Sequence, residues 1–152
     1  MAKKLGDEKV TENKKMIVWI IIPFVYGFVS NTFLLTMPPF LSQLVFAVFW
    51  FWVGMKFSCL SGNKVKSFFI GNSIWLLSFL LYLWQFALLD DESRNMFIAG
   101  ISQYYMLPFI WSGTILTLSF TDIIHGTTIT IISYLSMLLV FTIGFIIGKL
   151  KV

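Results

Sequence analysis

Charged residues are scarce in this chain, and their scarcity indicates its class. Of the 152 residues, 12% are charged and 58% are hydrophobic, whereas about 25% of an ordinary soluble domain is charged. Apolar runs of about 20 residues are long enough to cross a bilayer as helices. The sequence therefore predicts an all-α integral membrane protein, a single bundle of about five transmembrane helices with the lipid bilayer as its first partner.

Cysteine and histidine are almost absent, with Cys59 and His125 as the single examples. A single cysteine excludes an internal disulfide and a multi-cysteine metal site, and catalytic zinc needs three protein ligands. A glycine-rich phosphate loop of the G-x-x-x-x-G-K-[ST] kind is also missing. We therefore expect no metal, no other cofactor and no catalytic residue.

Ionisable side chains are missing from the middle of every apolar run. Proton relays, ion coupling and voltage sensing depend on such groups inside the membrane. Their absence argues against a proton-coupled antiporter, an intramembrane protease and a redox subunit with axial histidines. The net charge of +4 comes from lysines at the ends of apolar runs. That placement is typical of membrane topology, so no nucleic-acid partner is expected.

The stretch Ser67–Leu89 organises the predicted topology. It carries no formal charge, and as a helix it measures roughly 34 Å, enough to cross a hydrocarbon core of about 30 Å. Lys64 and Lys66 precede it, and the acidic run Asp90–Glu92, expected to be a solvated loop, follows it. Because lysine prefers the cytoplasmic side, the stretch is predicted to begin inside and end outside.

Four further apolar runs alternate around this stretch. Residues 1–15 form a cytoplasmic basic tail, expected to be disordered or to lie on the surface because its charge is mixed. Residues 16–152 form the polytopic transmembrane domain. Pro23 and Pro108 interrupt two of the runs and predict kinks. The five predicted spans cover about residues 16–37, 40–60, 67–89, 96–120 and 128–148.

The distribution of basic residues places the amino terminus in the cytoplasm. Five spans leave eight basic residues inside and three outside, namely Arg94, Lys149 and Lys151, and an excess inside is the usual pattern. The carboxyl terminus is then predicted to be extracellular. Its two lysines disagree with that placement. The alternative has four spans and a fourth segment that does not cross, and it places the carboxyl terminus inside.

Polar side chains in the third and fourth predicted spans form the candidate site. Lipid cannot satisfy their amide and hydroxyl groups, so such side chains face other helices or a cavity. At about 100° per residue, Gln103, Trp111 and Thr114 fall within one sector of a helix. The two interpretations are a ligand pocket that opens outward and a face that packs helices. The candidate residues are Asn72, Gln103, Tyr104, Trp111 and Thr114.

Two short patterns have both a structural and a functional interpretation. Asp122 and His125 are spaced to meet on one helical face and could orient a base or bind a metal, but we expect both in headgroup water. The pattern Gly144-x-x-x-Gly148 lets helices approach closely. It would serve either a homo-oligomer or packing within one chain.

These features favour a protein of a bacterial cell membrane that acts by binding a membrane-protein partner or a peptide, in an accessory or immunity-type role. The bacterial assignment comes from lysine outnumbering arginine ten to one, together with abundant phenylalanine and isoleucine. The alternative is a transporter or channel subunit for an uncharged or lipophilic small molecule. A lipid-active enzyme ranks last, since no catalytic pair is found.

Overall fold

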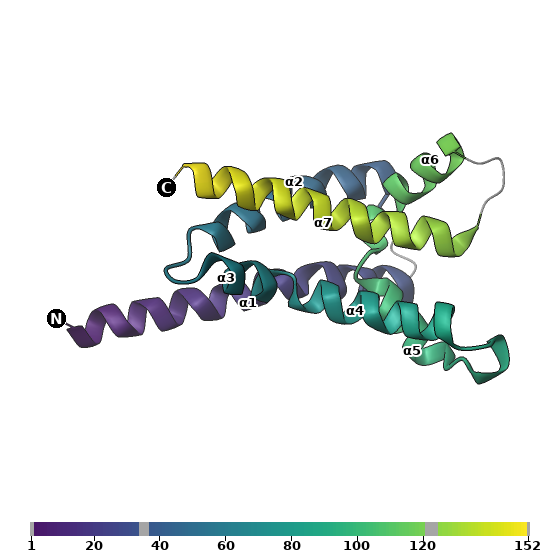
Figure 1. The fold of residues 1–152 in the computed structure, drawn as a ribbon, viewed down its shortest axis with the longest axis horizontal. Coiled ribbons are helices and arrows are strands. Elements are labelled where there is room, and N and C mark those ends of the chain that lie inside the picture. The colour runs from purple at the N-terminus through teal and green to yellow at the C-terminus, as the bar shows by residue number, and fades with distance from the viewer. Residues whose placement is uncertain (1, 34–36, 121–124, 152) are drawn as a thin grey trace.

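The computed structural model describes residues 2–33, 37–120 and 125–151, and within them every regular element is helical. The helices form two layers (Figure 1). One layer contains α1 (Ala2–Phe33), α3 (Lys64–Gly71), α4 (Ser73–Leu83) and α5 (Met96–Tyr104). The other contains α2 (Pro39–Ser58), α6 (Ile110–Phe120) and α7 (Gly126–Leu150). The start of α1 and the end of α7 lie at the same end of the bundle.

Three helices are long and apolar enough to cross a membrane, or four if α3 and α4 are counted as one bent span. The three cover Met16–Phe33, Pro39–Ser58 and Gly126–Leu150, which matches the first, second and fifth predicted spans. About five spans are not confirmed, because residues 96–120 do not form one long helix.

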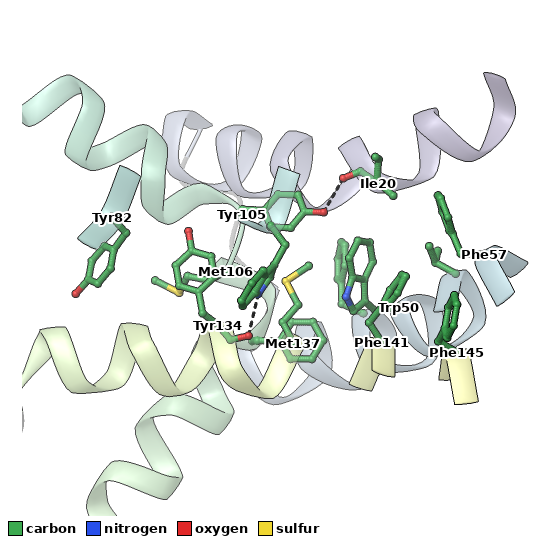
Figure 2. Close-up of a cluster of buried hydrophobic side chains, with 14 residues drawn as sticks. Ile20, Trp50, Phe57, Tyr82, Tyr105, Met106, Tyr134, Met137, Phe141 and Phe145 are labelled. Carbon is green, nitrogen blue, oxygen red and sulfur yellow. Dashed lines mark hydrogen bonds between the residues drawn. The ribbon is translucent and has the colours of Figure 1, made fainter. Parts of the chain in front are cut away.

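The basic tail is part of α1 in the structure. This helix begins at Ala2 and continues to Phe33, so the segment expected to be disordered or surface-lying is its first part. Pro23 lies inside the helix and leaves the carbonyl of Trp19 without its helical donor. At the next residue, the carbonyl of Ile20 accepts a hydrogen bond from the Tyr105 hydroxyl at 2.8 Å (Figure 2).

Helices α2 and α7 share the most extensive helix contact in the described residues. Gly144 lies against the backbone of Phe51, and Gly148 lies against the backbone of Met55. Gly54 on α2 meets the backbone of α7 in the same way. Small residues at such positions let two helix backbones approach closely. The pattern Gly144-x-x-x-Gly148 therefore packs helices within one chain.

The third predicted span is bent at Asn72. Helices α3 and α4 meet at 55°, and α4 continues into the π-helical turn η1 (Trp84–Leu88). The side-chain nitrogen of Asn72 donates to the carbonyl of Phe68 at 3.0 Å, a local bond that competes with regular helix formation. Gly71 before it is a weak helix former. The predicted stretch Ser67–Leu89 is therefore a broken helix.

The fourth predicted span, residues 96–120, differs most from the sequence-based expectation. Helix α5 ends at Tyr104, the 3-10 turn η3 (Leu107–Phe109) follows, and α6 begins at Ile110. Pro108 explains the break, because proline lacks a backbone N–H and fits only the first turn of a helix. Helices α5 and α6 are each roughly 15 Å long, about half of a hydrocarbon core. We call this segment the α5–α6 hairpin.

The α5–α6 hairpin begins and ends at the same end of the bundle (Figure 1). Asp91 and Arg94 before α5 line the same cavity as Gly126 and Thr127 after α6. The hydroxyl of Tyr82, near the end of α4, donates to the carbonyl of Thr127 at 3.4 Å. The start of α5 and the end of α6 therefore lie at one end of the bundle. Helix α7 then runs from that end to the opposite one, where α1 begins.

An aromatic cluster fills the space between the two layers (Figure 2). Trp50, Tyr105 and Phe141 are each 0% exposed. The ring of Trp50 lies 5.9 Å from that of Tyr105 and 5.5 Å from that of Phe141. Tyr82 and Phe57 lie toward opposite ends of the cluster. Large aromatic side chains thus make the core continuous along the bundle.

Candidate functional site

A cavity of about 540 Å³ lies between the turn of the α5–α6 hairpin, the link before α5 and the start of α7, and we call it the hairpin cavity. Ligand pockets have volumes of about 300 to 1,000 Å³, so it is large enough for a small ligand. Its walls come from the end of α4, the link before α5, the hairpin and the start of α7. The polar side chains in these walls include Asp91, Arg94, Gln103, Thr127 and Thr130.

Arg94 holds the rim of the hairpin cavity in place. Its Nη2 lies 2.8 Å from Oδ1 of Asp91. Its Nε donates to the carbonyl of Gln85 at 2.9 Å, and the guanidinium lies 4.4 Å from the ring centroid of Phe86. The buried side chain of Gln85 accepts from the backbone N–H of Asn95 at 2.9 Å. The link between η1 and α5 is therefore tied down at several points, and the rim is preformed.

Gln103 is the predicted site residue that the structure places in the cavity wall. It lies near the end of α5, and Thr127 and Thr130 contribute from the first turns of α7. Thr130 donates its hydroxyl to the carbonyl of Gly126 at 3.0 Å. Amide and hydroxyl groups both donate and accept hydrogen bonds. The wall therefore suits a ligand that has both kinds of group.

The break in the hairpin separates two other candidates from Gln103. The sector containing Gln103, Trp111 and Thr114 requires a continuous helix, and the turn at 105–109 removes that register. Trp111 is exposed, and Thr114 donates to the carbonyl of Ile110 within α6 at 2.9 Å. Neither lines the hairpin cavity. The single sector predicted for these residues is not present, because the chain at Pro108 forms a turn between two helices and not a kink within one.

Tyr104 faces α1 instead of the hairpin cavity. Its hydroxyl accepts from the side-chain nitrogen of Asn31 at 3.1 Å, and its ring lies 6.0 Å from that of Phe24. The carbonyl of Tyr104, whose helical donor Pro108 removes, lies against Gly27. Tyr104 therefore anchors the hairpin to α1.

Asn72 lies at the bend of the third span and is not a wall of the hairpin cavity. It is buried, and its Oδ1 has no hydrogen-bond partner among the described residues. Its geometric role is to break the helix between α3 and α4.

Two side chains satisfy backbone groups that the hairpin leaves open, and neither was assigned this role from the sequence. The Tyr134 hydroxyl donates to the carbonyl of Ser102, which lacks its helical donor because the N–H of Met106 bonds elsewhere. Gln43 accepts the backbone N–H of Ser112 through Oε1 at 2.6 Å. Lipid offers no partner for such groups. The sequence signal for the role of Gln43 was an amide side chain within the largely apolar second predicted span.

The remaining titratable candidates do not form a site in the described part of the chain. Asp122 lies outside the described residues, so its pairing with His125 stays a prediction. His125 is exposed and directly precedes α7. Among the residues that the structure describes, no three His, Cys, Asp or Glu side chains are grouped so as to hold a metal ion.

The fold and the cavity define a class, an all-helical protein with apolar helices of membrane-crossing length and a broken hairpin. No protein-family model matches the chain, and neither a curated protein nor a solved structure matches it.

Proposed function

We propose that this is a four-span protein of a bacterial cell membrane, with both termini in the cytoplasm. The course of the α5–α6 hairpin supports this topology, since α7 returns to the end where α1 begins. Ten of the eleven basic residues then lie inside: five in the tail, three around the α2–α3 link and two at the carboxyl end. Arg94 alone lies outside. The five-span topology places eight inside and three outside, so the four-span topology fits the positive-inside pattern better.

In this orientation the hairpin cavity opens on the extracellular side. We propose that the protein acts there by binding a peptide, either free or as a loop of a membrane-protein partner. The observation that carries the proposal is the preformed cavity with mixed walls. Gln103 and Thr127 offer donors and acceptors that match those of a peptide backbone, and Ile110 and Ile129 offer apolar surface for a side chain.

The preformed rim favours binding, because a rigid site loses little conformational entropy when its ligand binds. The same rim favours a non-enzymatic role. The carboxylate of Asp91 and the guanidinium of Arg94 form an ion pair with each other. Asp91 is the one carboxylate among the described residues that line the cavity, and none of them is a histidine, so no free base stands beside the threonines to activate them as nucleophiles.

Photocrosslinking tests the binding proposal. A photoreactive amino acid replaces Gln103, or replaces Leu139 on α7, which is 60% exposed, as a lipid-facing control. In the native cells, we expect a discrete polypeptide adduct from position 103 that is absent from position 139. The adduct should weaken when Arg94→Gln disturbs the rim. No polypeptide adduct from position 103, or equal adducts from both positions, would contradict peptide binding.

Transport of an uncharged or lipophilic molecule is the second candidate function. Interrupted membrane helices mark the substrate sites of many transporters, and both the α3–α4 pair and the α5–α6 hairpin are interrupted. However, the buried rings of Trp50, Tyr105 and Phe141 lie between the two ends of the bundle (Figure 2). A passage would require these rings to move.

Flux measurements separate the two candidates. Uncharged solutes are offered to proteoliposomes that contain the purified protein and to liposomes without it. Under the binding proposal, both preparations should take up each solute at the same rate. Faster uptake that requires the protein would favour transport.

A further inference from the structure

A second pocket, of about 470 Å³, lies beside the α2–α3 link, at the end of the bundle that carries both termini. We call it the link pocket. Met16 from α1, Phe57 from α2 and Ile70 from α3 supply apolar walls. Ser61 and Lys66 supply polar and basic groups. The pocket thus combines apolar and basic walls at one end of the bundle.

The link that borders the pocket has a defined conformation. Gly62 has a φ of 121°, in the left-handed region that glycine adopts without strain. The side chain of Asn63 accepts the N–H of Val65 at 2.9 Å and so caps α3. This turn fixes the first turn of α3, which carries Lys66, relative to the end of α2.

The two lysines of the link have different roles. Lys64 donates to the carbonyls of Ser58 and Leu60 at 2.8 and 3.0 Å, and so satisfies the carboxyl end of α2. Lys66 is exposed, lines the pocket, and has no hydrogen bond or ion pair within the described residues. Its ammonium is therefore available to an anion at the mouth of the pocket.

We propose that the link pocket binds one anionic phospholipid. The phosphate lies at Lys66 and the hydroxyl of Ser61, and an acyl chain lies along Met16, Phe57 and Ile70. Basic pockets between membrane helices bind anionic headgroups in this way. A soluble phosphate would gain nothing from the apolar walls, which is why we assign a lipid. The site is independent of the hairpin cavity and of the peptide proposed there.

Native mass spectrometry of the purified full-length protein tests this assignment. Phosphatidylglycerol and phosphatidylcholine with identical acyl chains are titrated onto the protein in detergent. We expect one retained phosphatidylglycerol, and Lys66→Gln should weaken its binding about fivefold, equivalent to about 1 kcal/mol. Lys149→Gln removes a charge at the same end of the bundle but outside the pocket, so retention should not change. Ile70→Trp keeps Lys66 and fills the apolar part, and it should also reduce retention.

Three results would overturn the assignment. Equal retention of both lipids would show that the headgroup charge is not recognised. Equal losses with Lys66→Gln and Lys149→Gln would show general attraction to a basic surface. Competition by glycerol phosphate as effective as that by the lipid would show that the acyl chain does not bind. Because no peptide is present, these outcomes do not depend on the function proposed for the hairpin cavity.

Discussion

The α2–α7 pair and the α5–α6 hairpin pack against the same aromatic core. They differ in how the hydrogen bonds of their backbone N–H and carbonyl groups are formed. Helices α2 and α7 run unbroken for 20 and 25 residues and approach each other through glycines. The helical bonding of the hairpin ends near the middle of the bundle, and side chains from two other helices bond to the backbone groups left open there. These side chains are Gln43 of α2 and Tyr134 of α7.

This difference indicates a hierarchy in the fold. The continuous pair is stabilised by its own backbone bonds and close contact, and it positions the groups that the broken segment needs. The hairpin in turn borders the cavity where we place function. Irregular backbone at membrane depth is tolerated where protein surrounds it, and the turn of this hairpin is buried between α1, α2 and α7. Changes in the pair should therefore affect the whole molecule, and changes in the hairpin should affect mainly the cavity.

The largest effect is expected from Gly144→Leu. The added side chain would collide with the backbone of Phe51, so α2 and α7 must separate. Overpacking of this kind costs about 1–3 kcal/mol and sometimes more, and we expect a large fall in thermal unfolding temperature in detergent. Gly100→Ala is the control, because the nearest atom to its new Cβ is the Tyr104 hydroxyl at 3.9 Å. A wild-type unfolding temperature for Gly144→Leu would contradict the account of the pair.

Gln43→Leu should have the next largest effect. It leaves the backbone N–H of Ser112 without its acceptor, and an unsatisfied buried donor costs about 1–3 kcal/mol. We expect lower thermal stability together with faster proteolysis near the start of α6. Leu44→Ala changes the neighbouring exposed residue and serves as the control. If both variants unfold alike, the amide of Gln43 does not support the hairpin.

Tyr134→Phe should have a smaller effect of the same kind. It removes the hydroxyl that donates to Ser102 and keeps the ring within the aromatic cluster. A single hydrogen bond contributes about 0.5–1.5 kcal/mol. Tyr26→Phe is the matched control, because no hydrogen bond of its hydroxyl is seen within the described residues. Thermal unfolding of the two variants should differ, and equal stability would remove Tyr134 from the account.

Thr114→Val should have the smallest effect, within about 0.5 kcal/mol, because surface-like changes away from special features rarely exceed that. Its hydroxyl bonds only to a carbonyl of its own helix.

Gln103→Leu should likewise keep the protein folded but remove an amide from the cavity wall. For this comparison the photoreactive amino acid replaces Thr127. We expect its polypeptide adduct to persist in Thr114→Val and to weaken in Gln103→Leu. An adduct that weakens in Thr114→Val and persists in Gln103→Leu would show that Thr114, and not Gln103, contributes to binding.

The sequence was sufficient to predict the helical class and the three helices that are long and apolar enough to cross a membrane. Long uncharged runs have few folding options in lipid, because only internal hydrogen bonding satisfies their backbone. This is why Pro39–Ser58 and Gly126–Leu150 match their predicted spans within two residues at each end. The structure places Gln103 in the wall of the hairpin cavity, and its role in binding a ligand stays a prediction.

The course of the fourth segment could not be predicted with the same certainty. A proline in an apolar run predicts either a kinked crossing or a return to the same side, and hydropathy is the same for both. The choice depends on partners distant in sequence, such as Gln43 for Ser112 and Tyr134 for Ser102. The lysines at the carboxyl terminus were the sequence signal for the alternative with four spans.

The side of the membrane that holds the carboxyl terminus tests the central claim most directly. A reporter that fluoresces only in the cytoplasm and a phosphatase that is active only outside are fused, in separate experiments, after Lys151. If the α5–α6 hairpin returns to the side it entered, the fluorescent fusion should be bright and the phosphatase fusion inactive. An active phosphatase together with a dark fluorescent fusion would mean that residues 96–120 cross the membrane, and it would contradict the four-span account.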